Sequence, residues 1–500
     1  MPSPRYFATL LSAATLTACG GQDDATGKKV ADEDPLVVTF SPCATETGPT
    51  DECATAQVPL DWNVDDGREI PSFVRRIPAT DPKRGQLWML AGGPTSGESL
   101  DWNARQMAEV FPDLDIYLPD HRGNGGSADW GCESNAATLE QAGDTEWYLG
   151  EVEDCFSYII AEYGDTALFG TTAAARDLLA LMEATESDGD RYVYSLSYGT
   201  YWAQRALQIA PDMADGVVLD SVCPPGLCGG LEIDAGRHSV GRLALERGTA
   251  DPMTRDLGPD PYAFLENMFE RLAAGHCSDV VGDRGLDPLR FALGGGQLSW
   301  FTTGQMQEAA FRLDRCSAAD MDALHFYAEL WDETTFGVNA AQLYMLGKTE
   351  MWTLPIPTPE ALDAEWADSV FRSGEPALRV RYTESLGDAR DAYSGAYPTS
   401  DTPILILSGE IDPTTPPEFA QEAMGNLENA RNYTFSNGRH GAVHSSFVDN
   451  DTRACGLQLM ADFLADPKGQ LDDGCLNHLV PNSWGLTADQ MEWLFGTSIP

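Results

Sequence analysis

The chain has 500 residues, of which 43% are hydrophobic and 9% aromatic, so it is long enough to bury more than one ordinary core. Its formal net charge of −47 argues against nucleic acid as a partner and against adhesion to anionic lipid by charge. We therefore expect a globular protein with two domains, or with one domain that carries a large insertion.

The first part of the chain has the pattern of an export signal. Residues 1–18 contain one basic residue and an apolar run that is too short to serve as a membrane anchor. The run ends in Leu16-Thr-Ala-Cys19, which resembles a bacterial lipobox, in which the cysteine is lipidated and becomes the first residue of the mature chain. Residues 19–34 are then a flexible tether. We expect a lipoprotein of the bacterial cell envelope that touches the membrane only through Cys19; the alternative is ordinary cleavage and secretion.

The cysteines indicate disulfides. Removing Cys19 from the eleven leaves ten, an even number that favours about five disulfides in an exported chain. The connectivity cannot be derived, but plausible pairs that lie close in sequence are Cys43–Cys53, Cys132–Cys155, Cys223–Cys228, Cys277–Cys316 and Cys455–Cys475. A metal site is the competing interpretation, and it is weak because no Cys-x-x-Cys pair is present. We expect neither a metal nor another cofactor.

Strand-like and helical patterns alternate through the first half of the chain. Strands are predicted at 36–40, 72–77, 86–90, 114–118, 192–194 and 216–220, and helices at 171–185 and 201–210. Strands that alternate with helices predict an α/β fold with a mostly parallel sheet and helices on both faces. The earliest strands have no helices between them, so the sheet is expected to begin antiparallel.

The pattern changes after residue 223. Residues 224–398 contain helical stretches and no run of sheet strands, and a strand pattern resumes at Pro403. We expect a core made of residues 35–223 and 399–500, interrupted by a helical cap. An insertion at this point lies over the carboxyl ends of the strands, where open α/β sheets bind ligands.

A serine turn follows the strand at 192–194. In Ser195-Leu-Ser-Tyr-Gly199, a strand must reverse sharply into a helix so that the Ser197 hydroxyl projects above the sheet. Ser195 occupies the place where glycine is usual, and it is the rival nucleophile. A helix N-cap is the alternative role for Ser197.

Two further side chains complete the candidate site. A serine hydroxyl needs an adjacent base, and the base needs an orienting carboxylate. His440 and Asp412 each follow an apolar strand, and the chain order Ser197, Asp412, His440 is that of the α/β-hydrolases. His444 is the second candidate for the base, and Glu410 for the carboxylate.

Acyl transfer also needs hydrogen-bond donors for the developing oxyanion. The glycine-rich segment at 91–97 directly follows the strand at 86–90. We assign the N–H groups of Gly93 and Tyr198 to this oxyanion hole. An ordinary turn is the alternative, and no Gly-Lys-Ser/Thr follows to support a phosphate loop.

Several of these segments together resemble the α/β-hydrolase peptidase family of prolyl iminopeptidases and secreted tripeptidyl aminopeptidases. They are Gly92-Gly-Pro94, Asp120-His-Arg-Gly-Asn-Gly-Gly-Ser127, Ser197-Tyr-Gly-Thr200, Val218-Leu-Asp-Ser-Val222, Ser408-Gly-Glu-Ile-Asp-Pro-Thr-Thr-Pro416 and Gly438-Arg-His-Gly441. The resemblance implies an α/β-hydrolase fold with a helical cap and carries Ser197, Asp412 and His440 over as the catalytic triad. The departures are Ala91, where the family has His or Asn, and Ser195.

The resemblance implies a hydrolase that removes residues or short peptides from free N-termini. Such an enzyme binds a substrate ammonium group, which needs carboxylates near the site. Glu329, Glu333 and Glu350 of the predicted cap are candidates, although most acidic residues in this chain are expected at the surface. The alternatives are a carboxylic ester hydrolase with the same triad and a non-catalytic surface-binding lipoprotein. The oligomeric state cannot be predicted.

Overall fold

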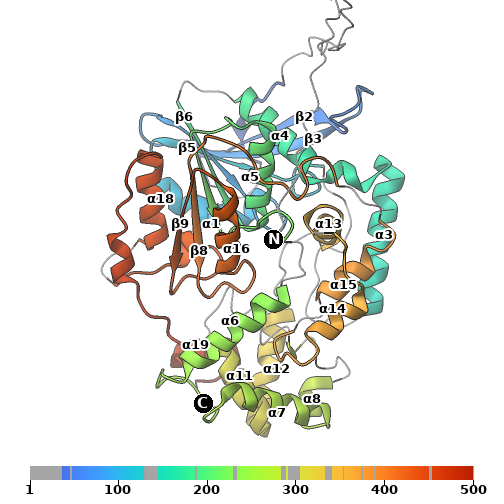
Figure 1. Cartoon of the computed structure of the whole chain (residues 1–500), viewed down its shortest axis with the longest axis vertical. Helices are drawn as coiled ribbons and strands as arrows, with labels where there is room; N and C mark the ends of the chain where they lie inside the picture. The colour runs from blue at the N-terminus through green and yellow to red at the C-terminus, as the bar shows by residue number, and fades with distance from the viewer. Residues whose placement is uncertain are drawn as a thin grey trace, which may run out of the picture. The chain divides into compact units, whose positions relative to one another are not determined.

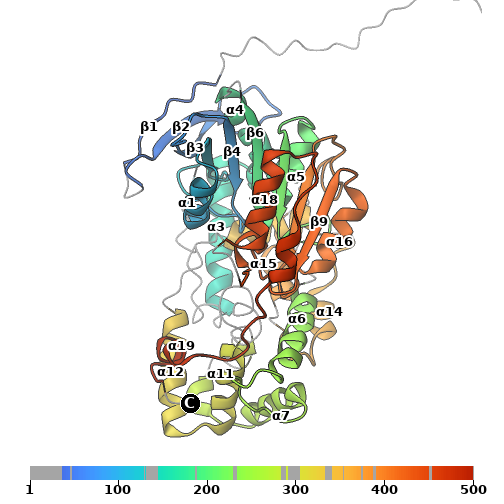
Figure 2. The same cartoon turned by 90° about the vertical axis from the view of Figure 1, so that its left-hand side faces the viewer.

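Among the residues that the structure describes, nine strands form one sheet in the order β1-β2-β3-β5-β4-β6-β7-β8-β9. This is a computed structural model, and Figures 1 and 2 show it in two views. The strands are β1 Ser41–Pro42, β2 Glu52–Pro59, β3 Glu69–Ile77, β4 Gly85–Leu90, β5 Leu114–Pro119, β6 Asp190–Leu196, β7 Gly216–Asp220, β8 Ile404–Gly409 and β9 Ala430–Phe435. Pairing is antiparallel from β1 through β3 to β5 and parallel elsewhere, which confirms the predicted sheet.

The described residues are 36–44, 48–128, 130, 145–185, 189–228, 233–282, 286, 289–290, 304–332, 340–352, 354–372, 375–386, 390–449 and 453–498. The predicted signal, tether and Cys19 lie outside them. The chain divides into two compact units, Met1–Pro35 and Leu36–Pro500. Within the described residues, no helix has the length and apolar character needed to cross a membrane.

The central strands are covered on both faces. All six residues of β4 are buried, and alternate side chains pack into different layers. Trp88 and Leu90 join a cluster with α4 (Thr171–Ala184), α5 (Tyr198–Ile209) and α16 (Pro417–Asn426). Leu87 and Met89 join a second cluster with α1 (Asp101–Val110) and α18 (Cys455–Ala465). The continuous apolar run at β4 is explained by this packing, in which helices cover the sheet on both faces.

Further helices lie between β4 and β6 or follow β9. They are η1 (Gly97–Leu100), α3 (Thr145–Tyr163), η3 (Thr166–Phe169), α17 (Ala442–Ser445) and η6 (Gly474–His478).

Every described element between β7 and β8 is helical. These elements are α6 (Ile233–Gly248), α7 (Pro261–Ala273), α8 (Ser278–Val281), α11 (Gly304–Arg315), α12 (Ala318–Asp332), α13 (Ala340–Leu346), η5 (Gly347–Met351), α14 (Pro359–Glu365) and α15 (Glu375–Tyr382). Helices α7 and α12 lie within residues 224–398, where the sequence predicts helical stretches.

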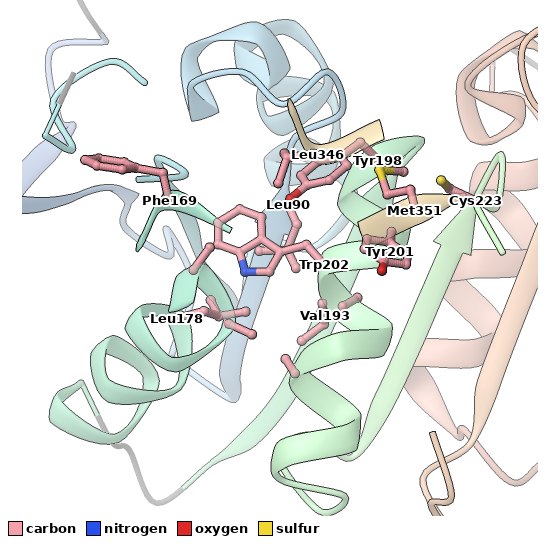
Figure 3. Close-up of a cluster of buried hydrophobic side chains, with 14 of the residues drawn as sticks. Leu90, Phe169, Leu178, Val193, Tyr198, Tyr201, Trp202, Cys223, Leu346 and Met351 are labelled. Carbon is pink, nitrogen blue, oxygen red and sulfur yellow. The ribbon is translucent and has the colours of Figure 1, made fainter. Parts of the chain in front are cut away.

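The helices between β7 and β8 pack in two different ways. Helices α6, α7, α11 and α12 share a hydrophobic cluster to which Trp484 and α19 (Ala488–Phe495) also belong, so the end of the chain packs with helices of the expected cap. In contrast, Leu346 of α13 and Met351 of η5 lie beside Tyr198 of α5, in the same hydrophobic cluster (Figure 3). Part of the expected cap is therefore built into the same hydrophobic layer as the helix that follows the serine turn.

At the first edge of the sheet, one predicted strand was wrong and one strand was missed. Residues 36–40 form no strand, while β2, which was not predicted, pairs with β3 along its whole length. In β2, buried Ala54, Ala56 and Val58 alternate with exposed residues. Alanine gives a weak strand signal, so this alternation is hard to see in the sequence.

Four of the five suggested disulfides are present. They are Cys43–Cys53, Cys223–Cys228, Cys277–Cys316 and Cys455–Cys475. Cys132 lies outside the described residues, and Cys155 is disulfide-bonded. Disulfides of this number are consistent with an exported protein.

Candidate active site

Ser197 lies at the junction of β6 and α5 in a strained backbone conformation. Its φ of 55° and ψ of −125° fall where residues other than glycine rarely lie. Close packing at the turn explains Gly199, because an added Cβ would lie 2.2 Å from the carbonyl oxygen of Leu90. The turn is therefore the sharp strand-to-helix reversal that the sequence predicts.

Ser195, the rival nucleophile at the end of β6, is hydrogen-bonded within the sheet. Ser195 is fully buried, and its hydroxyl donates to the carbonyl oxygen of Val218 at 2.9 Å. Ser197 is partly exposed, and its own carbonyl accepts from the N–H and the hydroxyl of Thr200. Of the two serines, only Ser197 presents its hydroxyl away from the sheet hydrogen bonds.

Asp412 and His440 form a hydrogen-bonded pair. The Nδ1 atom of His440 lies 2.9 Å from Oδ2 of Asp412, whose side chain is fully buried. The carboxylate also accepts from the N–H groups of Thr414 and Thr415, at 2.9 Å each, and from the Thr415 hydroxyl at 2.7 Å. The proline-containing loop after β8 thus holds Asp412 in one orientation.

Burial and charge act in opposite directions on this pair. Burial favours the neutral forms, but the mutual attraction of the two groups and their hydrogen bond outweigh it. The pKa of His440 is therefore raised above its ordinary value, and the pKa of Asp412 is lowered. The pair is arranged to carry a proton on the imidazole while the carboxylate stays ionised.

His444, the second candidate for the base, and Glu410, the second candidate for the carboxylate, have other partners. The His444 ring is largely buried and packs edge-on against Trp102, with ring centroids 5.1 Å apart, and burial lowers its pKa to about 4. Glu410 is paired with Arg247 of α6 at 2.9 Å. His440, and not His444, therefore holds the bond to Asp412, and Glu410 is held by Arg247.

The glycine segment after β4 lies directly against the serine. A Cβ added to Gly92 would lie 2.9 Å from the Cβ of Ser197, and Gly93 has a φ of 111°, which favours glycine. No hydrogen bond joins the N–H of Gly93 or of Tyr198 to another described residue. Both donors are therefore available beside the serine hydroxyl.

Sequence reasoning missed the residues that support this segment. The buried carboxylate of Asp120 accepts from the N–H of Gly97 at 2.6 Å and from that of Gly126 at 2.8 Å. The adjacent His121 places Nε2 2.9 Å from the hydroxyl of Tyr198, and burial lowers its pKa to about 3, so it is neutral. The polar motif at 120–127 was the available signal, but its partners cannot be read from the chain.

The end of β7 connects the serine turn to the histidine loop. The N–H of Ser197 donates to the carbonyl oxygen of Asp220 at 3.0 Å. The next residue, Ser221, accepts from the N–H of Gly441 at 2.9 Å. Two consecutive residues thus contact both segments, which brings the neighbourhoods of Ser197 and His440 together.

The three acidic residues suggested for substrate binding are placed differently. Glu350 is 5% exposed and already paired with Arg205 at 3.5 Å, and it accepts from the N–H of Thr171 at 2.9 Å. Glu329 belongs to α12, but its side chain is not described, and Glu333 lies outside the described residues. Glu350 is therefore not a free carboxylate, and the side chains of Glu329 and Glu333 lie outside the described residues.

The strand order, with a serine turn after β6 and an Asp–His pair after β8 and β9, is the arrangement of the α/β-hydrolase fold, and the chain has that fold. Residues 387–475, which include Asp412 and His440, match the model of a family described as TAP-like protein. TAP denotes tripeptidyl aminopeptidase, so the match confirms the resemblance seen in the sequence. The match covers less than a fifth of the chain and does not reach Ser197.

Solved structures of α/β-hydrolases are distantly similar. A serine hydrolase from Cycloclasticus zankles is 10% identical over 78% of this chain and 90% of its own, with a TM-score of 0.32. The proline iminopeptidase-related protein of Thermus thermophilus is 15% identical over 76% and 88%, with a TM-score of 0.29. An esterase from Exiguobacterium antarcticum is 14% identical over 75% and 90%, with a TM-score of 0.31. Scores of this size carry no argument about activity. No curated protein matches the sequence.

Proposed function

We propose that the protein is an exported serine aminopeptidase that releases N-terminal residues or short peptides through an acyl-enzyme on Ser197. The observation that carries the proposal is the hydrogen bond between buried Asp412 and His440, in a loop tied to the serine turn. The TAP-like match supports a peptide as the substrate. The disulfides support export, and we propose Cys19 as the lipid anchor.

The geometry supports one order of proton transfers. Because Asp412 occupies Nδ1 of His440, Nε2 is the atom that takes the proton from Ser197. The serine oxygen attacks the peptide carbonyl, and the N–H groups of Gly93 and Tyr198 stabilise the negative charge on the carbonyl oxygen. The imidazolium then gives its proton to the leaving amine. A water molecule, deprotonated by the same imidazole, attacks the acyl-enzyme and frees the serine.

A peptide with a free N-terminus brings an ammonium group to the site. A buried ammonium needs a carboxylate partner, because an unpaired charge is costly away from water. We keep Glu329 and Glu333 as candidates for this partner. Glu350 is left out, since Arg205 already balances its charge.

Labelling with a fluorophosphonate tests the nucleophile. The wild-type protein and Ser195→Ala are expected to react covalently, whereas Ser197→Ala is not. Ser195→Ala is the matched control because it removes a neighbouring hydroxyl that is bonded inside the sheet. Equal labelling of Ser197→Ala would refute the assignment, and no labelling of the oxidised wild type would return the protein to a non-catalytic surface-binding role.

A substrate panel tests the peptidase claim. Peptide amides with a free N-terminus should be cleaved, and the same peptides with an N-acetyl group should be cleaved far more slowly. Turnover of short-chain carboxylic esters without any peptide cleavage would assign the triad to ester hydrolysis instead.

A further inference from the structure

Two consecutive residues at the carboxyl end of β7, Asp220 and Ser221, contact three other segments of the chain. The carbonyl of Asp220 accepts from the N–H of Ser197 at 3.0 Å, and the N–H of Ser221 donates to the carbonyl of Leu407 on β8 at 2.8 Å. These backbone bonds continue the sheet on either side. The side chains, in contrast, both reach the segment that follows His440.

The side-chain bonds are specific to the histidine segment. The hydroxyl of Ser221 accepts from the N–H of Gly441 at 2.9 Å. Oδ2 of Asp220 accepts from the N–H of Val443 at 3.1 Å and from the hydroxyl of Tyr194 on β6 at 2.9 Å. The histidine is thus flanked on its C-terminal side by two backbone donors that are both bound to the end of β7.

Two further features mark these residues as more than sheet packing. Ser221 has a φ of 57°, so its backbone is strained in the same sense as that of Ser197. Asp220 is fully buried, and its carboxylate interacts with the N–H groups of Ala442 and Val443 as well as with the Tyr194 hydroxyl. A buried carboxylate is costly to desolvate, so its placement against the segment that follows His440 indicates an effect on that segment.

We propose that Asp220 and Ser221 are positioning residues that hold His440 in register with Ser197, with the Asp220 carboxylate acting on the imidazole as a second negative charge besides Asp412. The proposal rests on the proposed function, since it concerns the geometry of the same triad. It assigns a task to two residues that lie outside the triad. Misplacement of a catalytic group by about an ångström can cost roughly 100-fold in rate. Hydrogen bonds that fix the position of the His440 segment can therefore affect the rate strongly.

The electrostatics of the site agree with this assignment. The titratable groups that face Asp220 are His440 and Tyr194. Burial raises the pKa of Asp220 to about 7, against the lowering effects of the Val443 N–H, the Tyr194 hydroxyl and the charge of His440. Burial lowers the pKa of His440, the charge and hydrogen bond of Asp412 raise it, and the charge of Asp220 raises it further. The influence is reciprocal, as expected for two groups that interact through space.

The test compares two variants with matched controls in the full-length oxidised protein. Ser221→Ala removes the acceptor of the Gly441 N–H and is expected to slow fluorophosphonate labelling of Ser197 about 5- to 10-fold, the effect of one lost hydrogen bond, with the acidic limb of the pH profile unmoved. Ser221→Gly, which suits the positive φ, should show the same loss. Asp220→Asn removes the negative charge and should shift the acidic limb to lower pH.

The controls are buried residues of the same sheet that do not contact the histidine segment. Ser408→Ala loses a bond to Thr434, and Asp115→Asn loses contacts with Ala79 and Lys83. Both are expected to keep the wild-type labelling rate and pH profile. The proposal is overturned if Ser221→Ala and Asp220→Asn behave like these controls.

A second measurement separates this proposal from the proposed function. The pKa of His440, followed by NMR of its ring proton, should fall in Asp220→Asn whether or not the protein reacts with the probe. An unlabelled wild type would defeat the serine-hydrolase assignment alone, whereas an unchanged His440 titration would defeat the role of Asp220 alone. If Asp220→Asn fails to fold, the Ser221 variants decide the proposal.

Discussion

Glu350 and Arg205 form a buried ion pair across 145 residues of sequence, with Oε2 and Nη1 3.5 Å apart. Glu350 belongs to η5, in the segment between β7 and β8, and Arg205 to the helix that begins at the serine turn. The side chains are 5% and 2% exposed. The pair therefore ties part of the helical insertion to α5 and leaves Glu350 no charge to offer a substrate.

Removing one member of this pair should destabilise the protein strongly. Glu350→Gln leaves the Arg205 guanidinium with only the part-exposed carboxylate of Asp391, 3.7 Å away, and we expect a loss of about 3 kcal/mol in the free energy of unfolding. Denaturant titration followed by fluorescence measures it. Glu418→Gln, at an exposed position of α16, is the matched control and should change stability by less than about 0.5 kcal/mol. A loss below about 1 kcal/mol for Glu350→Gln would contradict the pairing.

The activity should fall on the acidic side of neutrality. The raised pKa of His440 means that the imidazole stays protonated to higher pH than an ordinary histidine, and only the neutral imidazole can accept the serine proton. The acidic limb of kcat/KM is therefore expected above pH 6.5, the ordinary histidine value. A limb at or below that pH would show that burial outweighs the carboxylates.

Asp412→Asn should change both the rate and this limb. The substitution removes the negative charge that raises the His440 pKa, so the limb moves to lower pH. It also disturbs the tautomer that presents Nε2 to Ser197, and a loss of about 10⁴-fold in kcat is expected, as for other Ser-His-Asp sites. Glu410→Gln, which lies in the same loop but pairs with Arg247, is the control and should retain activity.

Two glycines should respond to alanine in opposite ways. At Gly199 an added Cβ would lie 2.2 Å from the Leu90 carbonyl oxygen, so Gly199→Ala should distort the serine turn, abolish labelling of Ser197 and lower Tm. At Gly425, in α16, nothing lies within 4 Å. Gly425→Ala should stabilise the helix by up to about 1 kcal/mol with unchanged activity. Labelling and thermal unfolding of the two variants provide the comparison.

The disulfides should contribute unequally to stability. In the loop-closure view, the bond that closes the longer loop restricts the unfolded chain more. Cys277–Cys316 spans 39 residues and Cys223–Cys228 spans 5, so we expect stabilisation of about 4 and about 2 kcal/mol respectively. Replacing each pair by serines and measuring the free energy of unfolding tests the order. An equal loss in both variants would show that native-state contacts dominate.

The parts of the site that follow local rules could be predicted from the sequence. Ser197, Asp412 and His440 each follow an apolar strand, and parallel strands present their carboxyl ends at one edge. The backbone of Ser197 and the Asp412–His440 bond agree with those predictions. The catalytic roles stay predictions until the nucleophile is labelled.

The parts that depend on distant contacts could not be predicted. Glu350 has the sequence surroundings of a surface acid, and only the folded chain brings it to Arg205. In the sequence, Asp220 belongs to a predicted strand and to a segment that resembles the family. Its hydrogen-bond partners Tyr194 and Val443 lie 26 residues before it and 223 residues after it, so the sequence does not indicate them. The strand β2 was missed because its inward residues are mostly alanines.

The packing of α19 has a consequence for synthesis of the protein. The hydrophobic cluster that begins with Val240 of α6 is completed only by Trp484, Leu494 and Phe495. A nascent chain that has emerged only as far as α18 must leave uncovered the face of α12 that α19 contacts, including Tyr327, which stacks on Phe495. Chaperones that bind exposed apolar surface would therefore have a binding site on this incomplete helical bundle. Premature termination ahead of α19 would yield a product prone to aggregation.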